Sequence, residues 1–294
     1  MTLKRILFFG TPDIAVSTLE SLVQTDDVEI LAVCVFPDRK VGRRQVLMPC
    51  PVKKRAEELE LPIETIETKD DLIRVVQKYD FDFGIVIAFG MIFPGEILES
   101  GKFINVHFSL LPKYRGASPV QSAILNGDKV SGVTFQKMEA KLDAGDILFQ
   151  TAYSIEGKTT STVFEELSHH TAQLFPEFLK GTPPSKSQDE SAATFCTKFV
   201  KTDGEIFPEK ETAQQIYQKF LAFDFFPGIY LATERKGNVK LTDIRLKTDD
   251  GAFEIPCANY STLFILEAQI PGKKPMDVQD ILRGTPGLFS GYVS

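Results

Sequence analysis

Short apolar runs alternate with helical patterns through the first half of the chain. Three segments carry apolar residues at helical spacing, 13–23, 51–60 and 69–79. The runs between them are rich in Ile, Val and Phe and have the length of buried strands: Ile6–Phe9, Ile30–Phe36, Phe83–Ala88 and Phe103–His107. This alternation predicts the α/β class, with a Rossmann-like, mostly parallel sheet and helices on both faces.

Several local signals refine this pattern. Thr68 is suited to cap the third helix, because its hydroxyl can accept from a free backbone N–H of the first turn. Ser118 followed by Pro119 is typical of another helix start. Further strands are expected at 130–138 and 147–153, and a long helix at 161–179.

The composition changes at residues 181–191, which are polar and contain prolines, as linkers often do. Beyond them, one helical pattern is followed by several short β-like runs with turn residues between them, which predicts a small β-barrel or sandwich. We therefore expect an α/β domain at 1–183, a linker at 184–204 and a small β domain at 205–294.

Charge and cysteine usage narrow the class of protein. The 294 residues carry a formal net charge of −7 and contain no apolar run near the roughly 20 residues that a membrane span needs. The four scattered cysteines show no metal-ligand spacing, which favours free thiols in the cytoplasm and no metal site. One segment departs from the acidic average: residues 39–55 hold seven basic residues and no acid, so they can form a local basic patch.

Candidate chemistry lies at the end of the fourth apolar run. Asn105 and His107 are two residues apart, so on a strand their side chains share one face. In open parallel sheets ligands bind at the carboxyl ends of strands, where an amide and an imidazole can bind a developing oxyanion and move a proton. Asp143 or Asp146 could supply a carboxylate, and spacing does not choose between them. Taken alone, an Asn and a His on one strand, such as Asn105 and His107, are more often a structural polar pair than a catalytic one.

The residues around this pair resemble the signature of folate-dependent formyltransferases. The similar stretches are N-V-H-F-S-L-L-P-K-Y-R-G at 105–116 and L-D-A-G-D at 142–146. The resemblance implies a catalytic set of Asn105, His107 and Asp143, with 10-formyltetrahydrofolate as formyl donor. It also implies a folate site formed by two segments of the chain: Phe89, Gly90, Met91, Ile92, Ser109, Leu110, Leu111 and Pro112.

Three further stretches resemble the branch of this family that formylates the methionine carried by initiator tRNA. They are G-T-P-D at 10–13, the basic segment 36–53 and P-G-K-K-P-M-D-V-Q-D-I-L at 271–282. The resemblance implies that a basic loop enters the acceptor end of the tRNA, with Arg43 as its important arginine. It further implies that the C-terminal barrel is OB-like and helps to hold the tRNA. The implied tRNA-binding residues are Arg39, Lys40, Arg43, Arg44, Lys273 and Lys274, and we expect a monomer.

Other functions remain open on the sequence. A formyltransferase acting on an amino sugar nucleotide would share the catalytic domain. A nucleotide-binding module without catalysis is disfavoured because neither G-x-G-x-x-G after the first strand nor G-x-x-x-x-G-K-[ST] is present. A pure RNA-binding protein would leave Asn105, His107 and Asp143 without a task.

Some positions depart from the family pattern. Phe108 replaces a small residue beside His107, and Lys141 stands where glycine is common. The chain has no tryptophan, and Phe207 and Phe226 occupy positions where the family often has one. We expect these changes to affect substrate packing and to leave the catalytic set intact.

Overall fold

The computed structural model describes residues 3–42, 45–181, 184–248 and 250–292, and it divides into two compact units. Unit 1 comprises residues 1–119, 130–154 and 164–196. Unit 2 comprises residues 120–129, 155–163 and 197–294. Unit 2 therefore draws on three separate stretches of sequence. The domain limits expected from composition stay a prediction.

The described part of unit 1 contains a seven-stranded sheet with the order β10-β9-β7-β6-β1-β2-β5. Its strands are β1 (Lys4–Gly10), β2 (Val28–Val35), β5 (Ile63–Thr65), β6 (Phe83–Ile87), β7 (Phe103–His107), β9 (Val130–Lys137) and β10 (Ile147–Ser154). The neighbours from β7 to β5 run parallel, whereas β9 is antiparallel to both β7 and β10. The mostly parallel sheet is confirmed, with an antiparallel edge beyond β7.

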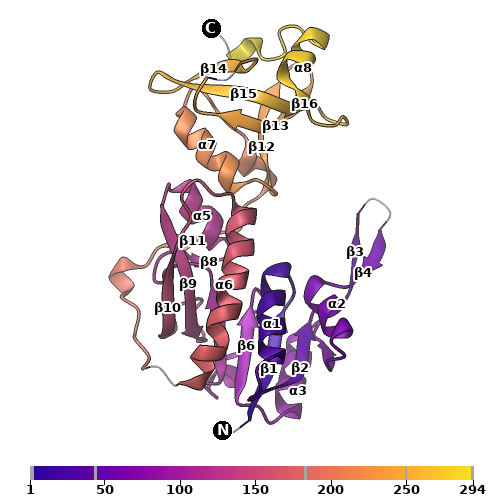
Figure 1. Ribbon diagram of the computed structural model, residues 1–294, viewed down its shortest axis with the longest axis vertical. Coiled ribbons are helices and arrows are strands. Elements are labelled where there is room, and N and C mark those ends of the chain that lie inside the picture. The colour runs from indigo at the N-terminus through magenta and orange to yellow at the C-terminus, as the bar shows by residue number, and fades with distance from the viewer. Residues whose placement is uncertain (1–2, 43–44, 182–183, 249, 293–294) are drawn as a thin grey trace. The chain divides into compact units, whose positions relative to one another are not determined.

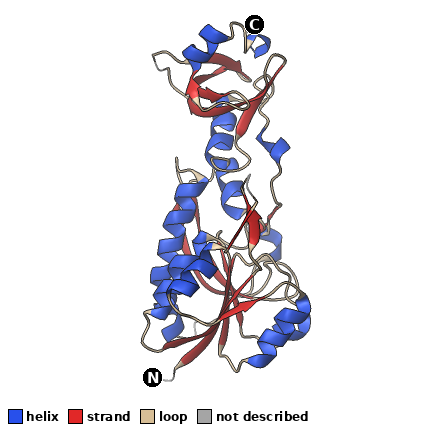
Figure 2. Cartoon of the chain, turned by 90° about the vertical axis from the view of Figure 1, so that its right-hand side faces the viewer, coloured by secondary structure: helices blue, strands red, loops and turns tan. Residues whose placement is uncertain are grey.

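Helices lie on both sides of this sheet (Figure 2). They are α1 (Val16–Val23), α2 (Pro51–Glu58), α3 (Lys69–Lys78), α4 (Gly95–Leu98) and α6 (Thr160–Lys180, with residues 160–163 in unit 2), with the 3₁₀ turn η1 (Asp13–Ala15) before α1. The cap of α3 is confirmed: the Thr68 hydroxyl accepts from the Asp71 N–H at 3.1 Å, and the Asp71 carboxylate accepts from the Thr68 N–H at 3.0 Å.

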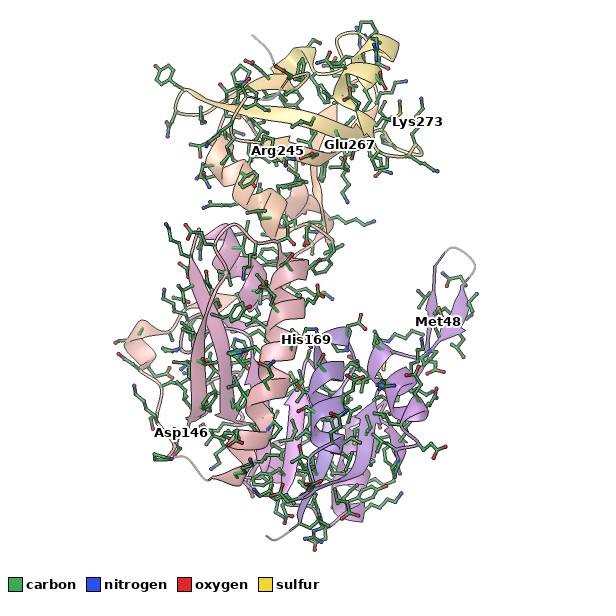
Figure 3. The ribbon with its side chains drawn as sticks, in the orientation of Figure 1. Met48, Asp146, His169, Arg245, Glu267 and Lys273 are labelled. Carbon is green, nitrogen blue, oxygen red and sulfur yellow. The ribbon has the colours of Figure 1, made fainter. Side chains whose placement is uncertain are left out.

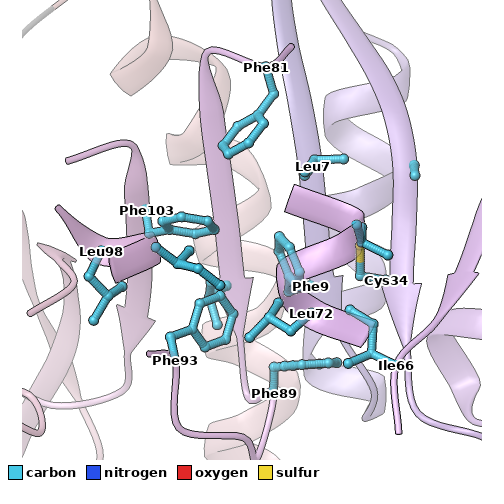
Figure 4. Packing of buried hydrophobic residues seen from close by; sticks show 14 residues of the cluster. Leu7, Phe9, Cys34, Ile66, Leu72, Phe81, Phe89, Phe93, Leu98 and Phe103 are labelled. Carbon is cyan, nitrogen blue, oxygen red and sulfur yellow. The ribbon is translucent and has the colours of Figure 1, made fainter. Parts of the chain in front are cut away.

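An aromatic cluster packs against the central strands (Figure 4). The ring of Phe9 on β1 lies 5.6 Å from that of Phe89, 5.3 Å from that of Phe93 and 6.0 Å from that of Phe103, measured between centroids. All four side chains are nearly or fully buried. Edge-to-face packing of this kind adds about 0.5–1.5 kcal/mol per pair beyond area burial. The cluster therefore fixes the loop that follows β6.

The basic segment, which was expected to be a flexible loop, contains a β-hairpin. It consists of β3 (Arg39–Val41) paired antiparallel with β4 (Val46–Met48), and it stands out from the rest of unit 1 (Figure 1). Its side chains are exposed, so it has no buried face to produce a strand pattern in the sequence. At its base, Lys53 Nζ lies 2.6 Å from an Asp38 carboxylate oxygen.

Unit 2 is built on an antiparallel sheet with the order β12-β13-β15-β14, and β16 pairs with β15. Its strands are β12 (Ile229–Thr233), β13 (Gly237–Arg245), β14 (Phe253–Cys257), β15 (Ser261–Gln269) and β16 (Met276–Asp277). Its helices are α5 (Pro119–Leu125, with Pro119 in unit 1), α7 (Ala213–Ala222) and α8 (Val278–Gly284). The antiparallel strands agree with the small barrel expected.

Short elements complete the description. A two-stranded parallel pair joins β8 (Arg115–Gly116) to β11 (Phe195–Cys196). The remaining 3₁₀ turns are η2 (Glu190–Ala192), η3 (Lys201–Gly204) and η4 (Ser290–Tyr292). Within the described ranges, no helix has both the length and the apolar character to cross a membrane.

Candidate active site

A row of polar side chains crosses from β7 to β9. The register pairs Asn105 with Gln136 and His107 with Thr134, and side chains of paired residues lie on one face of a sheet. The loop after β9 brings Asp143 to this row. Its carboxylate lies 3.4 Å from Asn105 Nδ2 and 3.7 Å from His107 Nδ1. The structure thus brings together the amide, imidazole and carboxylate that the sequence singled out.

Two neutral donors hold the Asp143 carboxylate in place. Gln136 Nε2 donates to one carboxylate oxygen at 2.9 Å, and the backbone N–H of Gly116 donates to the other at 2.8 Å. The side chain is only 8% exposed. Asp146, labelled in Figure 3, instead accepts from the Ser187 hydroxyl at 2.9 Å. Of the two aspartates that spacing left open, Asp143 is the one beside Asn105 and His107.

The contacts of His107 define its hydrogen positions. Nε2 lies 2.8 Å from the backbone oxygen of Tyr114, and a carbonyl oxygen can only accept, so Nε2 carries a proton. Nδ1 is the ring nitrogen that faces Asp143. A second proton on Nδ1 would therefore be placed beside a carboxylate. The imidazole is suited to hold or release a proton on that side.

The backbone of the L-D-A-G-D turn requires particular residues. Asp143 has a φ of +50°, a left-handed conformation that costs roughly 1–2 kcal/mol for a residue with a Cβ. Gly145 packs directly against the chain at Lys137, whose N–H donates to the Asp146 carbonyl at 2.9 Å. The small residue lets the turn return to β9 with the Asp143 carboxylate aimed at β7.

The first predicted folate segment follows β6. The ring of Phe89 is buried in the aromatic cluster, and it stacks on Phe36 with centroids 4.5 Å apart. Gly90 is exposed, and Ile92 is 74% exposed although it is apolar. Gly90, Met91 and Ile92 line a cavity of about 680 Å³ together with residues 36–39, 67 and 69. This volume lies within the ~300–1,000 Å³ typical of small-molecule sites.

The second predicted folate segment is mostly enclosed. Ser109 is fully buried and its hydroxyl donates to the Lys113 carbonyl at 2.6 Å, while Leu111 is 3% exposed. Leu110 and Pro112 are half-buried. Of this segment, Leu110 and Pro112 are therefore the side chains that a ligand can reach, and the other two support the loop.

Sequence reasoning missed Gln136, which touches the carboxylate of Asp143. It is 2% exposed and lies on β9 two residues after the buried Thr134. Polar residues at strand spacing inside an apolar run were a usable signal, since Asn105 and His107 form the same pattern on β7. The backbone N–H of Gly116 was missed because a glycine has no side chain to suggest a role.

Four of the predicted tRNA-binding residues lie on two exposed segments, the strand β3 and the turn between β15 and β16. Arg39 and Lys40 are exposed on β3, close in sequence to Met48 on β4 (Figure 3). Lys273 and Lys274 are exposed in the turn between β15 and β16. Arg43 and Arg44 lie outside the described residues.

Two departures from the family pattern are accommodated locally. Phe108 is buried and packs edge-on against Phe164, with centroids 6.3 Å apart. Lys141 Nζ binds the Glu190 carboxylate at 2.6 Å. In the part of the chain that the structure describes, no group of three or more His, Cys, Asp or Glu side chains is arranged to hold a metal ion.

Comparisons with known proteins agree with this geometry. The family model described as formyl transferase matches residues 4–179, and the model of the formyl transferase C-terminal domain matches residues 198–286. Curated relatives named methionyl-tRNA formyltransferase include proteins of Campylobacter lari, at 40% identity, and Campylobacter jejuni strain RM1221, at 39%. Each alignment covers 96% of this chain and 97% of the relative.

A solved structure shares the fold. The N-formyltransferase of Helicobacter canadensis, in complex with folinic acid and dTDP-3-aminofucose, matches with a TM-score of 0.67 and 20% identity over 90% of this chain and 99% of that one. Family models that match most of the chain, and relatives near 40% identity along almost its whole length, place the protein: it belongs to the formyl transferase family.

Proposed function

We propose that the protein transfers a formyl group from 10-formyltetrahydrofolate to the α-amino group of methionine carried by initiator tRNA. The observation that carries this proposal is the meeting of Asn105, His107 and Asp143 at the carboxyl end of β7. The name methionyl-tRNA formyltransferase, shared by relatives that align over almost the whole chain, supports tRNA rather than an amino sugar nucleotide as acceptor.

The three side chains have separate roles in the formyl transfer. The folate supplies the formyl carbon, to which the amine nitrogen of methionine bonds as the bond from that carbon to folate N10 breaks. The Asn105 amide would donate a hydrogen bond to the formyl oxygen as it gains negative charge. A proton on His107 Nδ1 would do the same from the other side.

The reaction also requires proton transfer. The attacking amine must lose a proton, and N10 of the folate must gain one when it leaves. Asp143 lies within 3.7 Å of His107 Nδ1 and is held by Gln136 and Gly116, so it is placed to accept and pass on that proton. Positioned acid–base groups of this kind contribute about 10²–10⁴ in rate.

The surroundings of the site suit a folate. The loop that begins with Ala88 continues directly from β6, whose residue Ile87 pairs with Val106 between Asn105 and His107. The cavity lined by Gly90, Met91 and Ile92 thus opens at the loop next to the catalytic strand. Ile92 exposes an apolar side chain to solvent, and the flat ring system of a folate would pack against it and remove it from water.

The basic hairpin supplies a surface for the nucleic acid. Arg39 and Lys40 are exposed on it, and cations that neutralise phosphates release counterions, which supplies affinity even in a protein of negative net charge. Arg43 and Arg44, from the same basic stretch of sequence, are proposed to act with them. Lys273 and Lys274 would add a second contact. We further propose that the protein acts as a monomer in the cytoplasm.

The test is transfer of labelled formyl from 10-formyltetrahydrofolate to charged initiator tRNA. We expect rapid transfer to methionyl initiator tRNA and much slower transfer to an uncharged tRNA or to a dTDP-linked amino sugar. Faster transfer to the amino sugar would replace the proposed acceptor while keeping the catalytic set. Absence of transfer to any amine would contradict the proposal as a whole.

A further inference from the structure

The polar segment that follows α6 is held along its length against β10, the L-D-A-G-D turn and β8. We call residues 186–196 the strap. At one end, Lys186 and Ile147 exchange two backbone hydrogen bonds of 2.8 and 2.9 Å. At the other end, the Thr194 carbonyl accepts from the Arg115 N–H at 2.8 Å, and β11 then pairs with β8. The strap therefore spans both segments that shape the site, the L-D-A-G-D turn and the loop after His107.

Gln188, in the middle of the strap, binds the turn that carries Asp143. Its Nε2 donates to the backbone carbonyl of Asp143 at 2.9 Å and to that of Gly145 at 2.7 Å. Its Oε1 accepts from Arg115 Nε at 3.0 Å. Because a guanidinium can only donate, Arg115 fixes which end of the Gln188 amide faces the turn.

Arg115 is suited to hold this orientation. Its side chain is fully buried, and its second contact is the Glu190 carboxylate, 2.8 Å from Nη2. Removing one partner from a buried charge is costly, so the three side chains are expected to act as a unit. The Glu190 carboxyl also binds Lys141, and the hydrogen bonds from both cations lower its pKa to about 2, so it is charged at neutral pH.

We propose that Gln188, oriented by Arg115, is a positioning residue that holds Asp143 in its catalytic geometry. Asp143 adopts an unfavourable left-handed conformation, and the two carbonyls that flank its turn are the ones that Gln188 binds. Without these bonds the turn can relax toward ordinary backbone angles and carry the carboxylate away from His107. This inference rests on the proposed function, in which Asp143 moves a proton.

The kinetic test replaces Gln188 by a side chain of similar shape without hydrogen-bonding groups. Gln188→Met should lower kcat for formyl transfer by about 10- to 100-fold, since a misplacement of about 1 Å can cost 10² in rate. The KM values for folate and tRNA should change less than about twofold, because Gln188 is not among the residues proposed to bind either ligand. Lys186→Ala, at an exposed position of the same strap, should keep the wild-type kcat.

A double-substitution cycle separates positioning from general stability. In an Asp143→Asn background, Gln188→Met should have almost no further effect on kcat, because the group that Gln188 positions is already disabled. A merely structural role would lower kcat by the same factor in both backgrounds. That additive result, or a Gln188→Met enzyme with wild-type kcat, would overturn the proposal.

Hydrogen exchange supplies a readout that does not depend on formyl transfer. The backbone amides of residues 141–146 should exchange faster in Gln188→Met than in the wild type, and at the wild-type rate in Lys186→Ala. If the wild-type protein transferred no formyl group while residues 141–146 still exchanged faster in Gln188→Met, that result would contradict the proposed function but support the positioning of Asp143 by Gln188. Unchanged exchange in Gln188→Met would contradict the positioning itself.

Discussion

A methyl group added at Gly145 would lie 1.8 Å from the backbone carbonyl oxygen of Lys137. The backbone oxygen of Lys137, at the end of the paired strand β9, cannot move aside as a flexible side chain can. Gly145→Ala should therefore shift the turn that carries Asp143 and destabilise the protein by about 1–3 kcal/mol. We expect kcat to fall by at least about tenfold, measured together with the free energy of unfolding in urea.

Gly284→Ala is the matched control. Gly284 ends α8, and nothing lies within 4 Å of the position that its Cβ would take. Activity and stability should stay close to wild type. A Gly145→Ala protein with wild-type kcat would show that the turn has room that the packing does not indicate.

Loss of any member of the catalytic set should lower turnover while the protein stays folded. Asn105→Ala removes one oxyanion donor, which typically costs about 10²–10³ in rate or roughly 3–4 kcal/mol. We expect losses of at least this size for His107→Ala and Asp143→Ala. Single-turnover formyl transfer measures them, with circular dichroism as a check of folding.

Asp146→Asn tests the choice between the two aspartates. Asp146 binds Ser187 rather than the imidazole, so its loss should change single-turnover rates by less than about threefold. A large loss for Asp146→Asn with near-normal rates for Asp143→Ala would reassign the carboxylate role.

Lys40 on the hairpin should affect tRNA use and leave folate binding unchanged. Lys40→Ala should raise the KM for tRNA, and it should reduce the slope of log affinity against log salt by about one if Lys40 contacts a phosphate. Binding assays across a range of salt concentrations measure this slope.

Lys4→Ala serves as the charge-matched control for the hairpin. Lys4 begins β1, so it lies at the amino ends of the parallel strands, opposite their carboxyl ends. Lys4→Ala makes the net charge more negative by the same amount as Lys40→Ala but should leave the salt slope unchanged. Equal effects of both substitutions would indicate a long-range field rather than contact by the hairpin.

Cys34 should make stability sensitive to alkaline pH. The thiol is fully buried on β2, and burial, with a smaller contribution from Glu64, raises its pKa well above the ordinary value of 9.0. The folded state therefore holds the proton more tightly than the unfolded state does. The associated stability is complete below pH 9 and is lost as the pH rises above it.

The contribution of the Cys34 thiol is measured by comparing how steeply the free energy of unfolding changes with pH in different variants. Above pH 9, the free energy of unfolding should fall more steeply in the wild type than in Cys34→Ala, by about 1.4 kcal/mol per pH unit. Cys50→Ala, which leaves Cys34 in place, should retain the wild-type slope. Parallel slopes in wild type and Cys34→Ala would contradict the burial of the thiol.

The sequence predicted those features whose cause is local or periodic. The strand β1 and the cap at Thr68 follow from apolar runs and from the residues of one turn, and both are present. Asn105 and His107 share a face because strand geometry repeats every two residues. The hairpin at 39–48 was missed because three-residue strands with exposed side chains leave no periodic trace.

The rest of the site depends on tertiary structure. The choice of Asp143 over Asp146 is set by a left-handed backbone angle and by the contact of Gly145 with Lys137, neither of which spacing encodes. The residues that hold Asp143 are distant in sequence, since Gln136 and Gln188 come from a strand and from a segment that reads as a linker. Only folding brings them together.

The pairing of β11 with β8 has a practical consequence for protein engineering. A fragment cut after residue 183, where composition alone would place the end of the α/β domain, would lack Gln188, Thr194 and the strand β11. Gly116, whose amide binds Asp143, would lose its neighbour Cys196. The backbone oxygen of Cys196 lies 2.0 Å from the position that a Cβ on Gly116 would take. An isolated catalytic fragment should therefore extend at least through Cys196 to retain its chemistry.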